Sequence, residues 1–283
     1  MTIDSQIVAD KFLRAFNVMA QNGHHTLARS LSGLARVTRV DDNLWDAICY
    51  NSAKDKRTPF MYACQKGDVD RVNFLLPHCG AEELYHEYSD RDGPLFIAAE
   101  NGHHTVVDTL CKYIKDHKIE GGIDFRGFYH KTPLMAAAGA LYQHPYAFLH
   151  LPGHQEKYRN VIVCLVNYGC DLEAYDANGD TVLIRAINKE DVETVKFLCM
   201  LGTDVNRIAG KPWYPLHAAI EKNNLEIATI LCEYGADVHR RTITGLSMAD
   251  FARTVSMESW MRGYPNGSLD PMIRMLEARS KGK

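Results

Sequence analysis

The stretch Tyr-Pro-Leu-His-Ala-Ala-Ile at residues 214–220 returns along the chain in altered spellings. Its other clear copies are Thr-Pro-Phe-Met-Tyr-Ala-Cys at 58–64, Gly-Pro-Leu-Phe-Ile-Ala-Ala at 93–99, Thr-Pro-Leu-Met-Ala-Ala-Ala at 132–138 and Thr-Val-Leu-Ile-Arg-Ala-Ile at 181–187. A weaker sixth copy begins at Ser247. With first positions at 58, 93, 132, 181, 214 and 247, the separations are 35, 39, 49, 33 and 33 residues. A basic period of 33 residues with insertions indicates an array of structural repeats.

Each copy is followed by a second apolar pattern. In the fourth and fifth copies this pattern has the spacing of one helix face: Val192, Val195 and Leu198, then Leu225, Ala228 and Leu231. Gly202 and Gly235 come after these stretches, where glycine commonly supplies a left-handed helix C-cap. Each unit is therefore predicted to be a helix, a tight turn, a second helix, a cap and an extended link.

This pattern resembles the ankyrin repeat over roughly residues 53–283. Asp176, Gly179 and Thr181 match part of the family's opening motif, Pro-Leu-His at 215–217 matches another part, and Gly-Ala-Asp-Val stands intact at 235–238. The resemblance implies an all-α repeat solenoid, an ankyrin-type stack of helix-turn-helix units joined by β-hairpin-like turns. Its fold is expected to continue along the whole chain as a single array.

The resemblance also implies that a threonine hydroxyl and a histidine ring form hydrogen bonds at the start of each first helix. Here the histidine is present only at His217. The five other copies have different residues at the equivalent position: Met61, Phe96, Met135, Ile184 and Asp250. We therefore expect a thinner polar network between repeats and heavier apolar packing.

The expected organisation is one ankyrin-repeat array over residues 1–283. Residues 1–50 are interpreted as a degenerate N-terminal capping repeat and link, because Asn-Gly-His-His-Thr at 22–26 is identical to 101–105. An unrelated helical pair carrying this phrase by chance is the alternative. Five full repeats are expected over 51–241, followed by a C-terminal capping repeat at 242–283. Asp270 is the expected N-cap of the last helix.

Two insertions interrupt this pattern, at 140–157 in the third full repeat and at 256–269 in the C-terminal repeat. Both are rich in aromatic residues, and the candidate binding residues among them are Tyr142, Tyr146, Phe148, Trp260 and Tyr264. Ordered loops on a rigid scaffold often carry function, although these could equally pack on their own repeat. His144, His150 and His154 have no recognised zinc-site spacing, so no metal and no cofactor are expected.

The composition excludes several classes of protein. The chain has 32 Lys and Arg against 35 Asp and Glu, and this near-neutral balance argues against a nucleic-acid or membrane-surface partner. The longest apolar stretch, 134–142, is far shorter than the ~20 residues of a membrane-spanning helix. The 8 cysteines form no CxxC pair, which favours a reducing compartment, and a cytoplasmic location is expected. Cys111, Cys199 and Cys232 share one repeat position and are predicted to be buried thiols.

The resemblance places exposed, variable residues on the turn tips just before each first helix. Aromatic and aliphatic residues at these positions are candidate anchors for a partner: Phe128, Tyr129, Trp213 and Leu246. Polar neighbours would form a rim around them: Lys131, Asn178, Asp180 and Lys211. Alternatively, Trp213 and Phe128 fold over neighbouring turns and only extend the scaffold.

The function expected from these observations is noncatalytic protein–protein interaction, as an adaptor, scaffold or inhibitor that binds a protein partner through the concave face. No catalytic motif is recognised, and the chain is expected to be a monomer by itself. The alternative is an enzyme or metal-dependent activity housed in the two insertions. A third possibility is that Asn206 is a substrate for an asparaginyl hydroxylase, because Leu198, Asp204 and Val205 precede it in a motif used by such an enzyme.

Overall fold

The computed structural model describes residues 59–78, 84, 93–142, 154–208, 214–261 and 270–281. The predicted N-terminal capping repeat at 1–50 lies outside the described residues. The described helices form consecutive pairs: α4 (Pro59–Lys66) with α5 (Val69–Leu75), α7 (Pro94–Glu100) with α8 (His104–Asp116), α9 (Pro133–Tyr142) with α10 (His154–Asn167), α11 (Val182–Asn188) with α12 (Val192–Met200), α13 (Pro215–Glu221) with α14 (Leu225–Glu233), and α15 (Met248–Met261) with α16 (Asp270–Lys281). Two short 3₁₀ helices, η1 (Leu76–His78) and η2 (Phe128–His130), lie in the connections.

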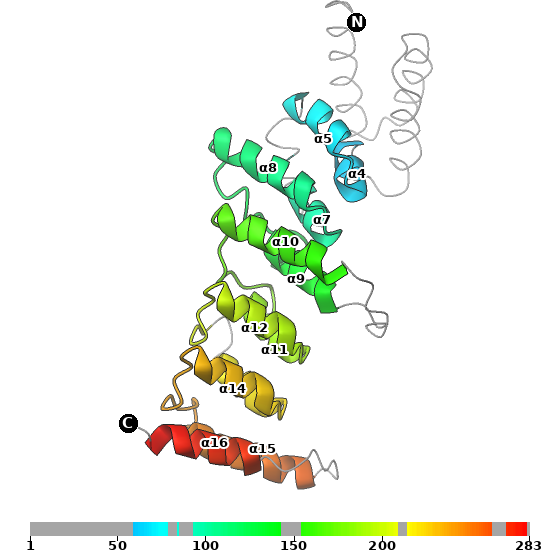
Figure 1. Cartoon of the computed structure of the whole chain (residues 1–283). Coiled ribbons are helices and arrows are strands. Elements are labelled where there is room, and N and C mark those ends of the chain that lie inside the picture. The colour runs from blue at the N-terminus through cyan, green and yellow to red at the C-terminus, as the bar shows by residue number, and fades with distance from the viewer. Residues whose placement is uncertain are drawn as a thin grey trace, which may run out of the picture.

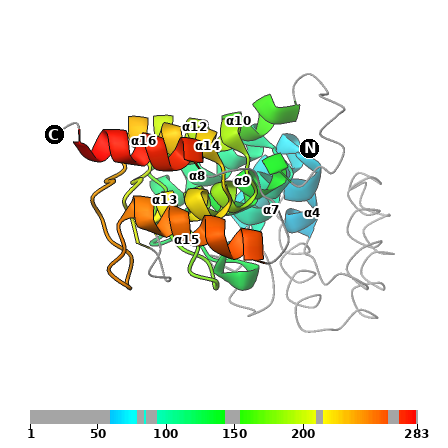
Figure 2. The same ribbon diagram turned by 90° about the horizontal axis from the view of Figure 1, so that it is seen from below.

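The helix pairs stack one above another into an elongated array (Figure 1). Helix α7 packs between α4 and α9, and α11 packs between α9 and α13, so the first helices form one layer. The second helices form the other layer, as the view along the stack in Figure 2 shows. The links between repeats form tight turns, and among the described residues one antiparallel bridge, between Tyr175 and Thr181, gives a turn its hairpin character. The prediction of an all-α repeat solenoid is confirmed.

The starts of the helices follow from short polar residues and proline. The hydroxyl oxygens of Thr132 and Thr181 each accept a hydrogen bond from the backbone N–H three residues later, at 3.3 Å. Asp68, Asp191 and Asn224 cap the second helices in the same way, at 3.0 Å. Pro94, Pro133 and Pro215 are the first helical residues, where a missing N–H leaves no hydrogen bond unmade.

The interior is a continuous apolar core between the two layers. Met61, Phe96, Met135 and Ile184, which replace the family's histidine, are all buried, with at most 6% of each residue exposed. Apolar side chains therefore fill the interior at these four positions. Asp250 is different, because it is exposed and its backbone N–H and carboxylate both bond to the Ser247 hydroxyl.

A ladder of hydrogen bonds ties the extended links of successive repeats together. The backbone N–H groups of Asp171, Asp204 and Asp237 donate to side-chain oxygens of Asp124, Glu173 and Asn206 at 2.8 to 3.0 Å. The Asn206 side-chain amide also donates to the Gly235 carbonyl oxygen at 2.9 Å. The links are thus held in a fixed register, which fixes the turn tips that follow them.

The turn between the two helices of a repeat requires a left-handed residue. Gly67 and Gly102 occupy this position with φ of 72° and 75°, whereas the equivalent residues Glu190 and Asn223 have φ of 57° and 54°. A side chain in this conformation is strained, glutamate more so than asparagine. At Gly67 a Cβ atom would also lie 2.4 Å from Nδ1 of His103, so that glycine is required by packing as well.

Replacing Glu190 with glycine is expected to raise the free energy of unfolding by about 1 kcal/mol, because it removes the left-handed strain from an exposed residue. Urea unfolding of the full chain measures this change. Glu193→Gly, an exposed glutamate inside α12, is the matched control and should lower stability. Equal losses in both variants would contradict the account of strain at Glu190.

The predicted insertion boundaries at 140–157 and 256–269 are wrong at their helical ends. Helix α9 continues to Tyr142 and α10 already begins at His154, while α15 continues to Met261. Between residue 140 and Pro145, and between residue 256 and Gly263, no proline or glycine interrupts the chain, so α9 and α15 continue, whereas α10 begins directly after Pro152 and Gly153. Asp270 is the first residue of α16 and not its N-cap. No described helix is long and apolar enough to cross a membrane.

Candidate functional site

The turn tip of the fourth repeat is built around the Asp176 carboxylate. One carboxylate oxygen accepts the backbone N–H groups of Asn178 and Asp180 at 2.8 and 3.1 Å. The other oxygen pairs with Arg185 Nη1 at 2.6 Å, and the side chain of Asp176 is completely covered. The turn is closed by Gly179 N–H donating to the Asp176 carbonyl oxygen at 2.9 Å. This buried ion pair therefore sets the shape of an otherwise exposed tip.

The tip of the third repeat has the same backbone pattern without such a carboxylate. Gly127 N–H donates to the Lys131 carbonyl oxygen at 2.9 Å, and His130 N–H donates to the Gly127 carbonyl oxygen at 3.0 Å. Tyr129 is 58% exposed, and the Lys131 ammonium lies 6.0 Å from the centre of its ring. Phe128 lies in η2, but its side chain is outside the described part of the structure.

The two tips contact each other directly. The backbone N–H of Ala177 donates to the Tyr129 carbonyl oxygen at 2.9 Å, which joins the tips across the repeat boundary. Arg126 Nη1 donates to the Tyr175 carbonyl oxygen at 3.1 Å, and the guanidinium lies 5.2 Å from the centre of the Tyr175 ring. Of the eight predicted tip residues, the structure thus places four on one connected surface: Tyr129, Lys131, Asn178 and Asp180.

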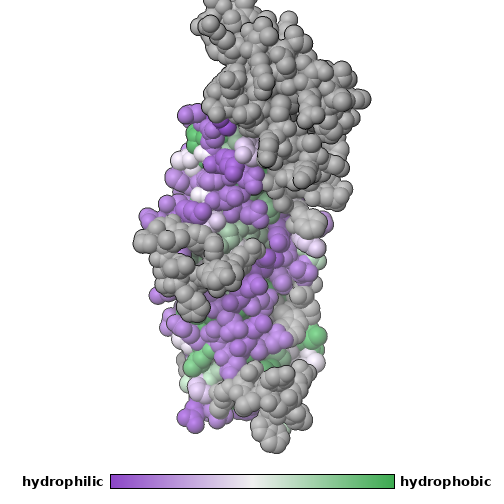
Figure 3. Space-filling view, turned by 90° about the vertical axis from the view of Figure 1, so that its right-hand side faces the viewer, coloured by the Kyte–Doolittle hydropathy of each residue, from purple (hydrophilic) through white to green (hydrophobic). Residues whose placement is uncertain are grey.

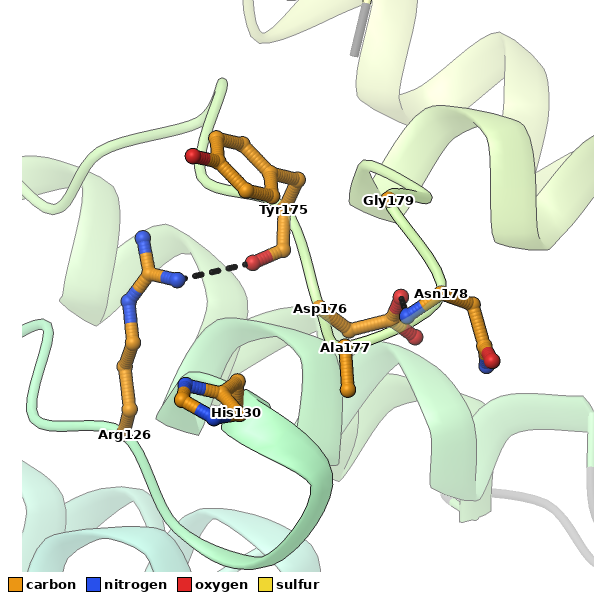
Figure 4. A pocket seen from close by; sticks show the side chains of 7 residues that line it. All are labelled: Arg126, His130, Tyr175, Asp176, Ala177, Asn178 and Gly179. Atoms are coloured by element: carbon orange, nitrogen blue, oxygen red, sulfur yellow. Dashed lines mark hydrogen bonds between the residues drawn. The ribbon is translucent and has the colours of Figure 1, made fainter. Parts of the chain in front are cut away.

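A hollow of about 430 Å³ lies between these two tips (Figure 4). Its lining consists of Arg126, His130, Tyr175, Asp176, Ala177, Asn178 and Gly179. Sequence reasoning singled out only Asn178 as a binding residue here, and it missed Arg126, His130 and Tyr175. The repeat register contains a signal for two of them, because Arg126 and Tyr175 both lie six residues before the first position of their repeats, at 132 and 181.

Three predicted tip residues belong to later repeats in the sequence: Lys211, Trp213 and Leu246. Lys211 and Trp213 fall outside the described residues. Leu246 is half-buried, and its backbone N–H donates to the Thr242 hydroxyl at 3.0 Å. On the same tip the exposed aliphatic residue is Ile243, with 78% of its surface accessible.

His217 belongs to α13, and its side chain is buried against α15. It is 3% exposed, its Nδ1 accepts the backbone N–H of Tyr214 at 3.2 Å, and its ring packs edge-on against Phe251 with 5.3 Å between centres. Burial lowers the pKa of His217 to about 4. The ring is therefore neutral at neutral pH and acts as a hydrogen-bond acceptor at the helix start.

The cysteines at the shared repeat position are buried, as predicted. Cys111, Cys199 and Cys232 are free thiols, each less than 9% exposed. Burial raises the pKa of the Cys199 thiol to about 11, and burial also raises the pKa of Cys111 and of Cys232. These thiols are protonated at neutral pH and pack as small apolar groups.

The helix ends that flank the two insertions lie on the opposite side of the array from the turn tips. In Figure 1 the end of α9 and the start of α10 lie on the right, as does the end of α15, whereas the links between repeats lie on the left. Tyr142 and Trp260 stand at these helix ends with side chains that are not described, and Tyr146, Phe148 and Tyr264 lie outside the described residues. His144 and His150 lie outside them too, and His154 is the first residue of α10. Among described residues, no group of three or more His, Cys, Asp or Glu could hold a metal ion.

The described surface on that side is mainly hydrophilic. Figure 3 shows this face with hydrophobic residues only in small separate areas. Two exposed aromatic residues lie instead on the contacting tips, Tyr129 with 58% and Tyr175 with 47% of its surface accessible. Hydrogen bonds between the tips hold their backbone in place. The two tips are thus the best-defined candidate for a binding surface.

Stacked helix pairs linked by tight turns define the class of α-helical repeat solenoids. A family model described as ankyrin repeats (3 copies) matches residues 16–120 and 149–242, which is well over half of the chain. The chain belongs to the ankyrin repeat family. A comparison with curated protein sequences found no significant match.

Solved structures share this fold. The ankyrin repeat domain of Bcl-3, a member of the IkappaB protein family, has 24% identity and a TM-score of 0.58, covering 81% of this chain and 89% of that chain. An ankyrin repeat domain from Acinetobacter baumannii AYE has 19% identity and a TM-score of 0.53, covering 77% and 97%. A chain from a complex of a Bdellovibrio bacteriovorus predatory endopeptidase with an immunity protein has 19% identity and a TM-score of 0.49, covering 70% and 92%. At these identities the first two matches show the fold alone.

Proposed function

We infer that this chain mediates a protein–protein interaction, as ankyrin repeat domains generally do. We propose that it is a noncatalytic adaptor, scaffold or inhibitor that binds a protein partner through the tips of its third and fourth repeats and the adjoining concave face. The layer of first helices and the tips beside it offer an extended surface for such a partner (Figure 2).

The observation that carries this proposal is the setting of Tyr129. Its ring is 58% exposed, while its backbone is fixed by the hydrogen bond from Ala177 and by a left-handed φ of 58°. A large aromatic group on a rigid backbone loses little entropy when it is buried in an interface. The Lys131 ammonium lies 6.0 Å from the centre of the ring, and a polar neighbour of this kind is usual at the rim of an aromatic anchor.

The proposal includes a cytoplasmic location, a monomeric state and no nucleic-acid partner. The formal net charge of −3 supports the last point, because many phosphates are neutralised by an excess of basic residues. The free thiols of the described cysteines support a reducing compartment.

Replacing Tyr129 with alanine is expected to weaken binding of the partner about 30-fold, the effect of losing one strong aromatic anchor. The partner is first recovered by affinity capture from a native lysate, and its dissociation constant is then measured with purified proteins. Met200→Ala is the matched control, since Met200 is 66% exposed but lies on α12 in the other helix layer. The melting temperature should stay nearly unchanged in both variants. A larger loss of affinity with Met200→Ala would contradict the proposed face.

A further inference from the structure

The hollow between the third and fourth repeat tips is lined by charged and polar residues. Arg126 and His130 stand on one side of it, and Ala177 and Asn178 stand on the other (Figure 4). At about 430 Å³ and open to solvent, it is large enough for one side chain of a partner, with room for water. The polar groups on its two walls determine which side chain fits.

His130 occupies a position where the other described tips have glycine. The residue that closes the turn is Gly179 in the fourth repeat and Gly245 in the last, with φ of 77° and 78°, and His130 has a φ of 57°. An imidazole at this position strains the backbone, whereas glycine would not. The backbone of the third repeat is therefore strained at His130, and the ring of this residue lines the hollow.

Arg126 provides the positive charge at this place. One of its N–H groups is bound to the Tyr175 carbonyl oxygen, and the guanidinium is held over the Tyr175 ring. Its other N–H groups have no hydrogen-bond partner among the residues that the structure describes. A guanidinium fixed in this way is oriented for a carboxylate without a further loss of side-chain freedom.

The acidic side chains nearby present no charge inside the hollow, although Asp176 is one of its lining residues. The Asp176 carboxylate is completely covered and is neutralised by Arg185 at 2.6 Å. Asp124 accepts the Asp171 backbone N–H at 3.0 Å, and burial raises its pKa although Arg126 opposes that shift. Asp180 is not among the lining residues. The charge presented to solvent inside the hollow is thus the positive charge of Arg126.

We propose that this hollow is a carboxylate subsite, which takes an aspartate or glutamate side chain from an extended segment of the protein partner. Arg126 forms the charged hydrogen bond, the His130 ring on the same wall adds a second one, and Tyr129 contacts the segment beside the acidic residue. This inference rests on the proposed function and specifies the chemistry of the partner.

The test uses the full ¹⁵N-labelled chain and small peptides as probes, so it does not depend on finding the partner. The peptide acetyl-Gly-Glu-Gly-amide is titrated while the Arg126 Nε–H and His130 imidazole nitrogen signals are followed by NMR. These signals should shift and saturate. Acetyl-Gly-Gln-Gly-amide, which has the same shape without the charge, should bind about tenfold more weakly or not at all.

Two arginine variants provide the matched comparison. Arg126→Gln should weaken the binding of the glutamate peptide about tenfold or more. Arg241→Gln removes the exposed arginine at the equivalent position of the last repeat, where it donates to the Gly245 carbonyl oxygen, and binding should be unchanged. His130→Gly should raise the melting temperature and at the same time weaken the binding of the glutamate peptide. If His130 had only a structural role, its replacement would not change peptide binding.

Three results would overturn the carboxylate subsite. Equal shifts with the glutamate and glutamine peptides would show that charge is not recognised. Unchanged binding in Arg126→Gln would place the peptide elsewhere. Tighter binding of acetyl-Gly-Gln-Gly with a free C-terminus than of the amidated glutamate peptide would assign the site to a chain end instead. Failure of the wider binding proposal would appear separately, as a partner whose affinity is unaffected by Tyr129→Ala.

Discussion

Replacing Asp176 with alanine is expected to lower the free energy of unfolding by about 3 kcal/mol. The substitution removes the carboxylate that pairs with Arg185 Nη1 at 2.6 Å, and the Arg185 side chain is only 17% exposed. Removing one member of a buried ion pair is strongly destabilising because the remaining charge stays desolvated. The backbone N–H groups of Asn178 and Asp180 also lose their acceptor, so the tip itself should loosen.

Urea unfolding of the full chain, followed by circular dichroism, measures this loss. The double variant Asp176→Ala/Arg185→Met removes both charges and should recover part of the stability, because no buried charge is left. Asp176→Asn should lie between wild type and alanine, since it keeps an acceptor for the turn. If the double variant were no more stable than Asp176→Ala, the ion pair would not be the source of the loss.

The second large effect concerns the pH dependence of stability through His217. Burial lowers its pKa from 6.5 to about 4, so the unfolded chain binds a proton at this residue more readily than the folded chain does. The stability that depends on a neutral His217 ring is fully present above pH 6.5, and it is lost as the pH falls from 6.5 to about 4. A shift of this size corresponds to a loss of about 3 kcal/mol over that interval.

The comparison of wild type with His217→Asn isolates this residue. Asp124 and Glu173, whose pKa values are raised by burial, have the opposite dependence, and stability arising from them increases as the pH falls. Urea unfolding at several pH values between 4 and 7 should show a shallower acid loss in His217→Asn than in wild type. Parallel curves for the two proteins would contradict a buried neutral imidazole.

The repeat pattern alone was enough to predict the fold. Thr181 and Pro215 identify helix starts because a hydroxyl cap and a missing N–H have local consequences that do not depend on the rest of the chain. Gly202, with φ of 90°, likewise adopts the left-handed conformation that its place after α12 predicts. The helix ends at Tyr142 and Met261 differ from the predicted insertion boundaries because each helix continues until Pro145 or Gly263 approaches, and a count of residues beyond the repeat period does not register this.

The site was less predictable because it depends on contacts between repeats. Tyr129 and Asn178 could be assigned to turn tips from the repeat register, but their connection arises from a backbone hydrogen bond to Ala177 that has no side-chain signature. The orientation of Arg126 depends in the same way on the Tyr175 carbonyl oxygen, which is 49 residues away in sequence. His130 could have been noticed as a histidine where the other tips have glycine, although only the structure shows that its ring lines a hollow.

We propose that the contacting tips of the third and fourth repeats form the surface that binds a protein partner. The most direct test is site-specific photocrosslinking with p-benzoylphenylalanine placed at position 129 or, in a separate variant, at position 200. Both positions are exposed, and they lie on the tips and on the second-helix layer, respectively. We predict that the captured partner is crosslinked from position 129 and not from position 200. Crosslinking from position 200 with none from position 129 would contradict the account.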